Sequence, residues 1–149
     1  MICLFVTDRR ACTALNAFYR VAFKKKESWA ENNGFRFSKS KTVCIHFCTK
    51  RSLHSDPSLK LYNCEIPVVS ETKFLGLVFD SKLSFKPHIE YLKKKCLKAM
   101  NLLRVVSNTN WEADSTTLLR LYRSLVRSKI DYGCIVYGSA RDSYLQTLD

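Results

Sequence analysis

Residues 73–90 read Lys73-Phe-Leu-Gly-Leu-Val-Phe-Asp80 and then Ser81-Lys-Leu-Ser-Phe-Lys-Pro-His-Ile-Glu90. The first part is short and rich in β-branched and aromatic residues, which predicts a strand over Lys73–Phe79. Gly76 lies inside this run, where a missing side chain would let another backbone or a ligand approach closely. Proline is favoured in the first turn of a helix, so Pro87 predicts the start of a long helix.

The rest of the chain alternates strand-like and helix-like patterns around this stretch. Expected strands are Cys3–Thr7, Phe35–Phe37, Thr42–Phe47 and a hairpin of Lys60–Tyr62 with Glu65–Val68; expected helices are Arg9–Asn33, Pro87–Ser107, Asp114–Lys129 and one from Ala140 onward. Apolar spacing predicts that the first helix buries Ala11, Leu15, Phe18, Ala22 and Trp29, and that the second buries Ile89, Leu92, Cys96, Ala99, Leu103 and Val106. Asn33-Gly34 predicts a helix stop, and Asp114 or Ser115 a helix cap. A boundary between two lobes is expected within Asp80–Lys86.

Composition favours a folded protein with a polyanionic partner. The chain has 149 residues, 46% of them hydrophobic, with a net charge of +12 and a pI near 9.5. Such a charge indicates nucleic acid as a partner, whereas the simpler alternative is a basic protein without a specific ligand. No apolar run approaches the length of a membrane span, and Asp8-Arg-Arg10 ends the first apolar run too early for a signal peptide. The seven cysteines are therefore expected to be reduced, in an intracellular protein of nucleus or cytoplasm.

Two further segments, with the opening stretch, carry a resemblance to a known family. They read Trp29-Ala-Glu-Asn-Asn-Gly-Phe-Arg-Phe-Ser-Lys-Ser-Lys-Thr-Val43 and Arg127-Ser-Lys-Ile-Asp-Tyr-Gly-Cys-Ile-Val-Tyr-Gly-Ser-Ala140. In order and spacing, the three segments resemble the end of the palm, the primer grip and the thumb of reverse transcriptases from non-LTR (LINE-type, jockey-like) retrotransposons. The resemblance covers nearly the whole chain.

The resemblance implies a fold and a parent activity. The expected fold class is α+β: a partial palm with a small antiparallel sheet and one packed helix in residues 1–80, then an all-helical thumb and the start of the following connection in residues 81–149. The parent activity would be RNA-directed DNA synthesis with magnesium, deoxynucleotides and an RNA/DNA template-primer.

The carboxylates of that chemistry are missing from the sequence. Polymerases of this family hold two divalent metal ions with adjacent aspartates, and no Asp-Asp, Asp-Glu or Glu-Asp pair occurs here. We therefore expect the chain to begin just after the catalytic hairpin, to lack the N-terminal polymerase segments, to hold no metal or cofactor and to be inactive alone. The alternative is a small basic, non-catalytic nucleic-acid-binding module. A third possibility is a non-functional reading frame whose product folds poorly.

Candidate site residues follow from the same comparison. Lys41 matches a palm lysine that could meet the leaving pyrophosphate, a role that would be vestigial here; otherwise it is an exposed turn lysine. Phe74, Leu75 and Gly76 match the primer grip; otherwise they belong to a core strand. Nucleic-acid contacts are expected from Lys93, Lys94, Lys98, Arg104, Arg120, Arg123 and Arg127, which otherwise form solvated helix faces.

A zinc site is a weaker interpretation of Cys44-Ile-His-Phe-Cys48. Positions 44, 46 and 48 would share one face of a strand, and His54 could supply a fourth ligand. Structural zinc sites usually take their ligands from tight knuckles, and none is present. Free cysteines and a half-buried histidine on a sheet face explain the pattern better.

Overall fold

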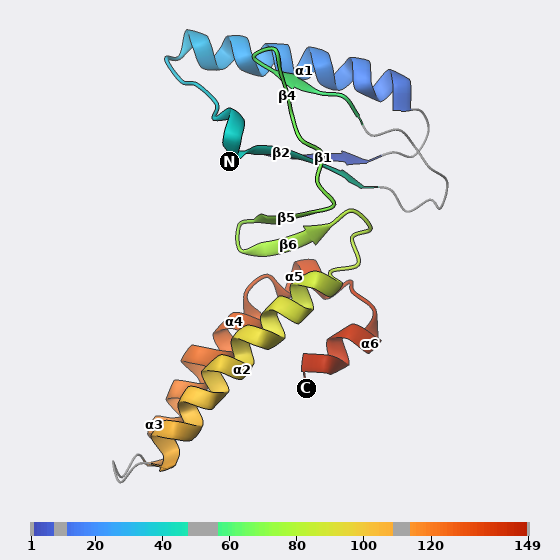
Figure 1. Cartoon of the computed structure of the whole chain (residues 1–149). Helices are drawn as coiled ribbons and strands as arrows, with labels where there is room; N and C mark the ends of the chain where they lie inside the picture. The colour runs from blue at the N-terminus through green and yellow to red at the C-terminus, as the bar shows by residue number, and fades with distance from the viewer. Residues whose placement is uncertain (1, 8–11, 48–56, 109–113, 149) are drawn as a thin grey trace. The chain divides into compact units, whose positions relative to one another are not determined.

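The computed structural model describes residues 2–7, 12–47, 57–108 and 114–148, and its course is drawn in Figure 1. The chain forms two compact units, Met1–Leu83 and Ser84–Asp149, which are described separately. The fold class is α+β, as the sequence predicts. Within the described residues, no helix is long and apolar enough to cross a membrane.

The first unit is built on a pair of parallel strands. Strand β1 (Ile2–Thr7) pairs with β2 (Thr42–Phe47), with Ile2 opposite Thr42, and helix α1 (Cys12–Asn32) connects them. This pair is parallel because the intervening helix returns the chain to the same end of the sheet. The antiparallel pairing expected from the sequence occurs in two hairpins, within residues 60–65 and 71–80. A short 3-10 helix, η1 (Lys39–Lys41), leads into β2.

Helix α1 ends in a complete Schellman motif. Gly34 has φ +71°, its N–H donates to the Glu31 carbonyl at 3.1 Å, and the Phe35 N–H donates to the Ala30 carbonyl at 2.8 Å. The Asn33-Gly34 stop predicted from the sequence is thus confirmed. The strand predicted over Phe35–Phe37 is wrong, since this segment turns back against the end of the helix.

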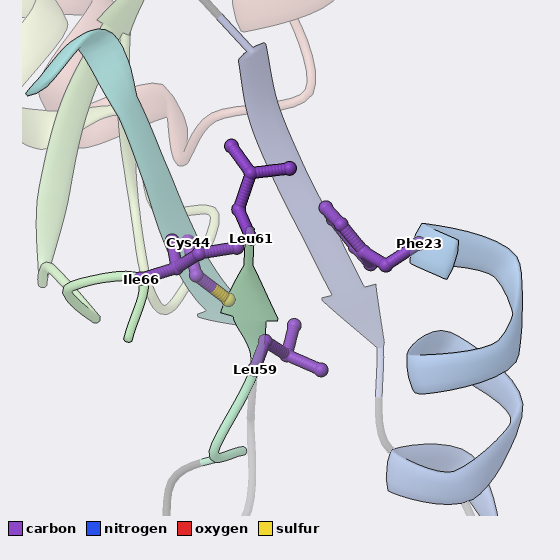
Figure 2. Close-up of a cluster of buried hydrophobic side chains, with 5 residues drawn as sticks. All are labelled: Phe23, Cys44, Leu59, Leu61 and Ile66. Atoms are coloured by element: carbon purple, nitrogen blue, oxygen red, sulfur yellow. The ribbon is translucent and has the colours of Figure 1, made fainter. Parts of the chain in front are cut away.

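The hydrophobic core of this unit lies between α1 and a short hairpin. Strands β3 (Lys60–Leu61) and β4 (Cys64–Glu65) pair across Tyr62 and Asn63, both in the left-handed conformation of a two-residue hairpin turn. The buried side chains, shown in Figure 2, are Phe23, Cys44, Leu59, Leu61 and Ile66. Cys44 is therefore a buried core residue. Cys48 and His54, the other ligands of the zinc interpretation, lie outside the described residues.

The face that α1 buries differs from the predicted one. Phe18 and Trp29, expected inside, are 68% and 58% exposed, while Phe23 and Ala30 are buried. Tyr19, Phe23 and Ala30 also recur at spacings of four and seven, so α1 carries two apolar stripes. The stripe that meets the β3–β4 hairpin is buried, and the side chains of Ala11 and Leu15 lie outside the described part.

The second unit is helical throughout its described residues. Its elements are α2 (Lys86–Asn108), α3 (Ser115–Tyr122), a π-helical turn η2 (Arg123–Arg127), α4 (Ser128–Asp131), α5 (Cys134–Tyr137), α6 (Asp142–Leu145) and the 3-10 helix η3 (Gln146–Leu148). Asp114 caps α3, accepting a hydrogen bond from the Thr117 N–H at 2.7 Å, as the sequence predicts. The helix expected over Asp114–Lys129 is confirmed, since helical backbone continues without a break over residues 115–131. The π-helical turn η2 inside it has no signal in the sequence.

The core of the second unit joins α2 to the α3–η2–α4 segment. It contains Ala99, Leu103 and Val126, with half-buried Cys96, Met100, Leu121, Leu125 and Ile130 against them. Burial raises the pKa of the Cys96 thiol, with nearby Lys129 acting in the opposite direction, so this side chain is neutral at pH 7.

Candidate nucleic-acid interface

The segment predicted as one primer-grip strand is a tight hairpin. Strands β5 (Glu71–Phe74) and β6 (Leu77–Asp80) pair antiparallel, with Phe74 opposite Leu77. Leu75 (φ 47°) and Gly76 (φ 85°) form the two-residue turn, so the prediction of a continuous strand over Lys73–Phe79 is wrong. The turn was not predicted because leucine is not a typical residue at a left-handed turn position.

The turn of this hairpin projects an apolar side chain into solvent. Leu75 is 70% exposed and Gly76 is exposed, whereas Phe74 is half-buried and Leu77 is buried. A left-handed conformation costs about 1–2 kcal/mol for a residue with a side chain, and such strain persists where function or surrounding structure requires it. The hairpin therefore presents an exposed tip rather than a core strand.

Lys41 lies at the end of η1, directly before β2, and its side chain is exposed. Its backbone position is fixed by the next residue, because Thr42 is buried and its hydroxyl donates to the Ser38 carbonyl at 2.7 Å. Strand β2 contacts β5 within the same unit. The structure thus places Lys41 as an exposed cation just before the strand that contacts β5.

The cations predicted on α2 all face solvent. Lys93, Lys94, Lys98 and Arg104 are exposed, and the buried side of the same helix carries Leu92, Ala99 and Leu103. Within the part of the chain that the structure describes, no ion pair is present for Lys93, Lys94 or Lys98. Arg104 Nη1 donates to Asn101 Oδ1 at 3.3 Å, which leaves its charge uncompensated. This face can contact successive phosphates without breaking an existing ion pair.

The second group of predicted cations follows on α3 and η2. Arg120 and Arg123 are exposed, and so is Arg127, whose Nε lies 3.6 Å from Asp131 Oδ2 in a solvent-exposed ion pair. Such a pair contributes little to stability, yet it lowers the charge that Arg127 offers to a ligand. The π-helical turn carries Arg123 and Arg127, and π turns are frequent at functional sites.

Some exposed cations of the first unit were not predicted as binding residues. Arg20, Lys24 and Lys60 line a groove of about 450 Å³ between α1 and the β3–β4 hairpin, with Glu27 and Glu65 on its walls. The Lys24-Lys-Lys26 run was the only sequence pattern that pointed to these cations. The proximity of Lys60 to Lys24 depends on the tertiary structure and could not be predicted from the sequence.

Comparison with known proteins extends over both units. No family model matches the chain, and no solved structure matches it. The chain is 30% identical over 121 residues to a retrovirus-related Pol polyprotein from the type-1 retrotransposable element R1 of Bradysia coprophila, covering 80% of this chain and 12% of that protein. It is 24% identical over 149 residues to a probable RNA-directed DNA polymerase from transposon X-element of Drosophila melanogaster, covering 99% of this chain and 16% of that protein.

A third relative is the RNA-directed DNA polymerase from mobile element jockey of Drosophila melanogaster, 26% identical over 82% of this chain and 13% of that protein. The chain's homologues are the RNA-directed DNA polymerases of non-LTR retrotransposons. The predicted resemblance to this family is confirmed. The match to the X-element protein spans nearly the whole chain and therefore includes the β5–β6 hairpin and the basic helices. The chain spans less than a fifth of the length of these relatives.

Proposed function

We propose that this chain is the primer-grip and thumb portion of a retrotransposon reverse transcriptase, and that it holds a template-primer without performing the chemistry. The observation that carries the proposal is the succession of a strained, exposed hairpin tip at Leu75-Gly76 and an amphipathic helix whose Lys93, Lys94 and Lys98 make no ion pair with any described residue. The homology supports the proposal, since the relatives are RNA-directed DNA polymerases by name.

A metal-dependent polymerase step does not fit the residues of this chain. The sequence contains no adjacent pair of acidic residues. Among the described residues, no group of three histidine, cysteine, aspartate or glutamate side chains could hold a metal ion. Because two-metal catalysis needs converging carboxylates, we derive no chemical step for this chain. We propose that magnesium in the parent enzyme is bound by residues that this sequence does not contain.

The cationic helices would act on the phosphate backbone. Each phosphate that a lysine or arginine neutralises releases condensed counterions, which gives affinity that is independent of sequence and falls with salt. Lys94, Lys98 and Arg104 lie on one helix whose other side is anchored by Leu103 and Ala99, so the cations are held on a stable support.

The main alternative is a small basic, non-catalytic module that binds nucleic acid in its own right. The absence of an acidic pair from the sequence favours it equally. Sequencing of the DNA upstream of the Met1 codon distinguishes the two, because an in-frame Asp-Asp pair there supports the polymerase assignment.

The proposed function is tested on the full chain with a fluorescent RNA/DNA hybrid. We expect a dissociation constant of about 1–100 μM at physiological salt and no primer extension with magnesium and deoxynucleotides. Joint substitution of Lys94→Ala, Lys98→Ala and Arg104→Ala should weaken binding. The control removes the same charge at Lys86 and Lys95 of α2 and at Arg141, none of which is a proposed contact. Equal weakening by both triple variants, or template-dependent extension, would contradict the proposal.

A further inference from the structure

The C-terminal end of α1 carries a stacked pair of exposed aromatic rings. The rings of Trp29 and Phe35 are stacked, with centroids 6.3 Å apart and planes 8° from parallel. The Schellman motif at Gly34 fixes Phe35 against the helix, and the Asn33 side chain donates to the Trp29 carbonyl at 2.8 Å. Trp29 is 58% and Phe35 64% exposed, so most of this preorganised aromatic surface faces solvent.

Lys25 and a further aromatic residue share this side of α1 with Trp29. Lys25 precedes Trp29 by four residues, and Phe18 precedes Lys25 by seven, which places the three on one face of the helix. Phe18 is 68% exposed, and Lys24, Lys25 and Lys26 are all exposed. An apolar protein partner would have to desolvate these lysines, whereas a polyanion would gain from them.

The groove between α1 and the β3–β4 hairpin carries mixed charge. Glu27 and Glu65 line it together with three cations, and Glu65 lies opposite Lys60 across the hairpin. Lys24 belongs both to the lysine run and to the groove that Arg20 and Lys60 line. Glu27, on the same wall, is already engaged by the Tyr62 N–H at 2.6 Å. Arg20 Nε donates to the Ser58 carbonyl at 3.4 Å, which orients its guanidinium without neutralising it.

We propose that the outer face of α1 is a second nucleic-acid site, which binds single-stranded nucleic acid. A base stacks on the Trp29–Phe35 pair, and the adjoining phosphates contact the exposed lysine run Lys24-Lys-Lys26. Aromatic platforms flanked by cations bind single strands without sequence preference, because every base offers a flat face. A duplex is excluded from stacking, since its bases are already paired and stacked on one another. This site belongs to the first unit, whereas the basic helices belong to the second.

The experiment uses the full chain with Trp111→Phe, which leaves Trp29 as its only tryptophan. We expect a twelve-residue oligothymidylate to quench the Trp29 fluorescence, and inorganic tripolyphosphate, which has charge but no bases, to leave it unchanged. Absence of quenching at saturating oligonucleotide, or the same quenching by tripolyphosphate, would overturn the proposal.

Affinity for the oligothymidylate supplies a second readout, with the chain carrying a native Trp111. Trp29→Ala should weaken binding about 5-fold or more, as expected for loss of one stacked base, and Trp29→Phe should restore most of it. The control is Ile135→Ala, which removes an apolar side chain that is 94% exposed in the other unit. Equal effects of Trp29→Ala and Ile135→Ala would overturn the proposal, as would self-association of the chain that Trp29→Ala abolishes.

The two proposals fail separately. Joint substitution of Lys94→Ala, Lys98→Ala and Arg104→Ala should leave the amplitude of Trp29 quenching at saturation unchanged. If quenching is absent while hybrid binding still depends on these three residues, the α1 site is wrong and the proposed function stands. If quenching persists while hybrid binding is unchanged by loss of Lys94, Lys98 and Arg104, the proposed function is wrong and the α1 site stands.

Discussion

The Glu27 carboxylate accepts a hydrogen bond from the Tyr62 backbone N–H at 2.6 Å and so ties α1 to the turn of the β3–β4 hairpin. Tyr62 is half-buried and has φ 48°, a conformation that its side chain disfavours. The charged acceptor therefore stabilises both the strained turn and the closure of the hairpin over Phe23 and Leu61.

Removal of this acceptor should lower the stability of the first unit. We expect Glu27→Ala to reduce the free energy of unfolding by about 1.5–3 kcal/mol, because a hydrogen bond to a charged group is lost and the N–H is left without its partner. Urea denaturation followed by circular dichroism measures the change. Glu31→Ala, at an exposed position of the same helix, is the control, and an equal loss there would refute the role of Glu27.

Gly34 should be intolerant of a side chain for conformational reasons alone. A Cβ at this position would meet no atom within 4 Å, but φ is +71°. We therefore expect Gly34→Ala to destabilise the chain by about 1 kcal/mol and Gly34→Asn by less, since asparagine tolerates the left-handed region. Thermal unfolding of the two variants gives the comparison. Alanine as stable as glycine would mean that the helix end relaxes out of the Schellman motif.

A substitution in the β5–β6 turn should have opposite effects on the stability of the fold and on binding of the RNA/DNA hybrid. Leu75→Gly removes a left-handed leucine that is 70% exposed, so it should raise the free energy of unfolding by up to about 1 kcal/mol. The same substitution should weaken binding of the RNA/DNA hybrid if the tip contacts nucleic acid. Denaturation and fluorescence anisotropy on one preparation test both effects. Stabilisation without any loss of binding would remove Leu75 from the interface.

The cap of α3 should make helix stability depend on pH. Hydrogen bonds from the side chain and backbone of Thr117 hold the pKa of Asp114 below its usual value near 3.8. A carboxyl with a lowered folded pKa stabilises the fold above its unfolded pKa, and that contribution is lost as pH falls through the folded pKa. We expect a loss of helicity below about pH 4 that is smaller in Asp114→Asn, because asparagine caps equally well without titrating. Identical pH profiles by circular dichroism would contradict this.

Local signals in the sequence predicted the elements that depend on nearby residues. The strand at Thr42–Phe47, the stop at Gly34, the cap at Asp114 and the helix that begins beside Pro87 all agree with the structure. Each depends on side chains or turn residues within a few positions of the element, which is why the sequence was sufficient.

Features set by distant contacts were not predictable in the same way. The parallel pairing of β1 with β2 brings together residues 40 positions apart in the sequence. Helix α1 has two apolar stripes, and the one that contacts the β3–β4 hairpin is buried. In the candidate site, the exposed cations of α2 were predictable because charges avoid a helix core. The turn at Leu75-Gly76 and the stacking of Phe35 on Trp29 were not, because a leucine in the left-handed region and a ring packed on a helix end leave no local pattern.

The salt dependence of hybrid binding tests the central claim most directly, which is that Lys94, Lys98 and Arg104 on α2 hold the phosphate backbone. The binding constant of the full chain for an RNA/DNA hybrid should fall linearly with salt concentration on logarithmic axes. In the variant lacking Lys94, Lys98 and Arg104, the slope should be shallower by about 2–3, close to the number of phosphate contacts removed. The variant lacking Lys86, Lys95 and Arg141 should keep the slope of the parent chain. A slope unchanged by loss of Lys94, Lys98 and Arg104 would contradict the account.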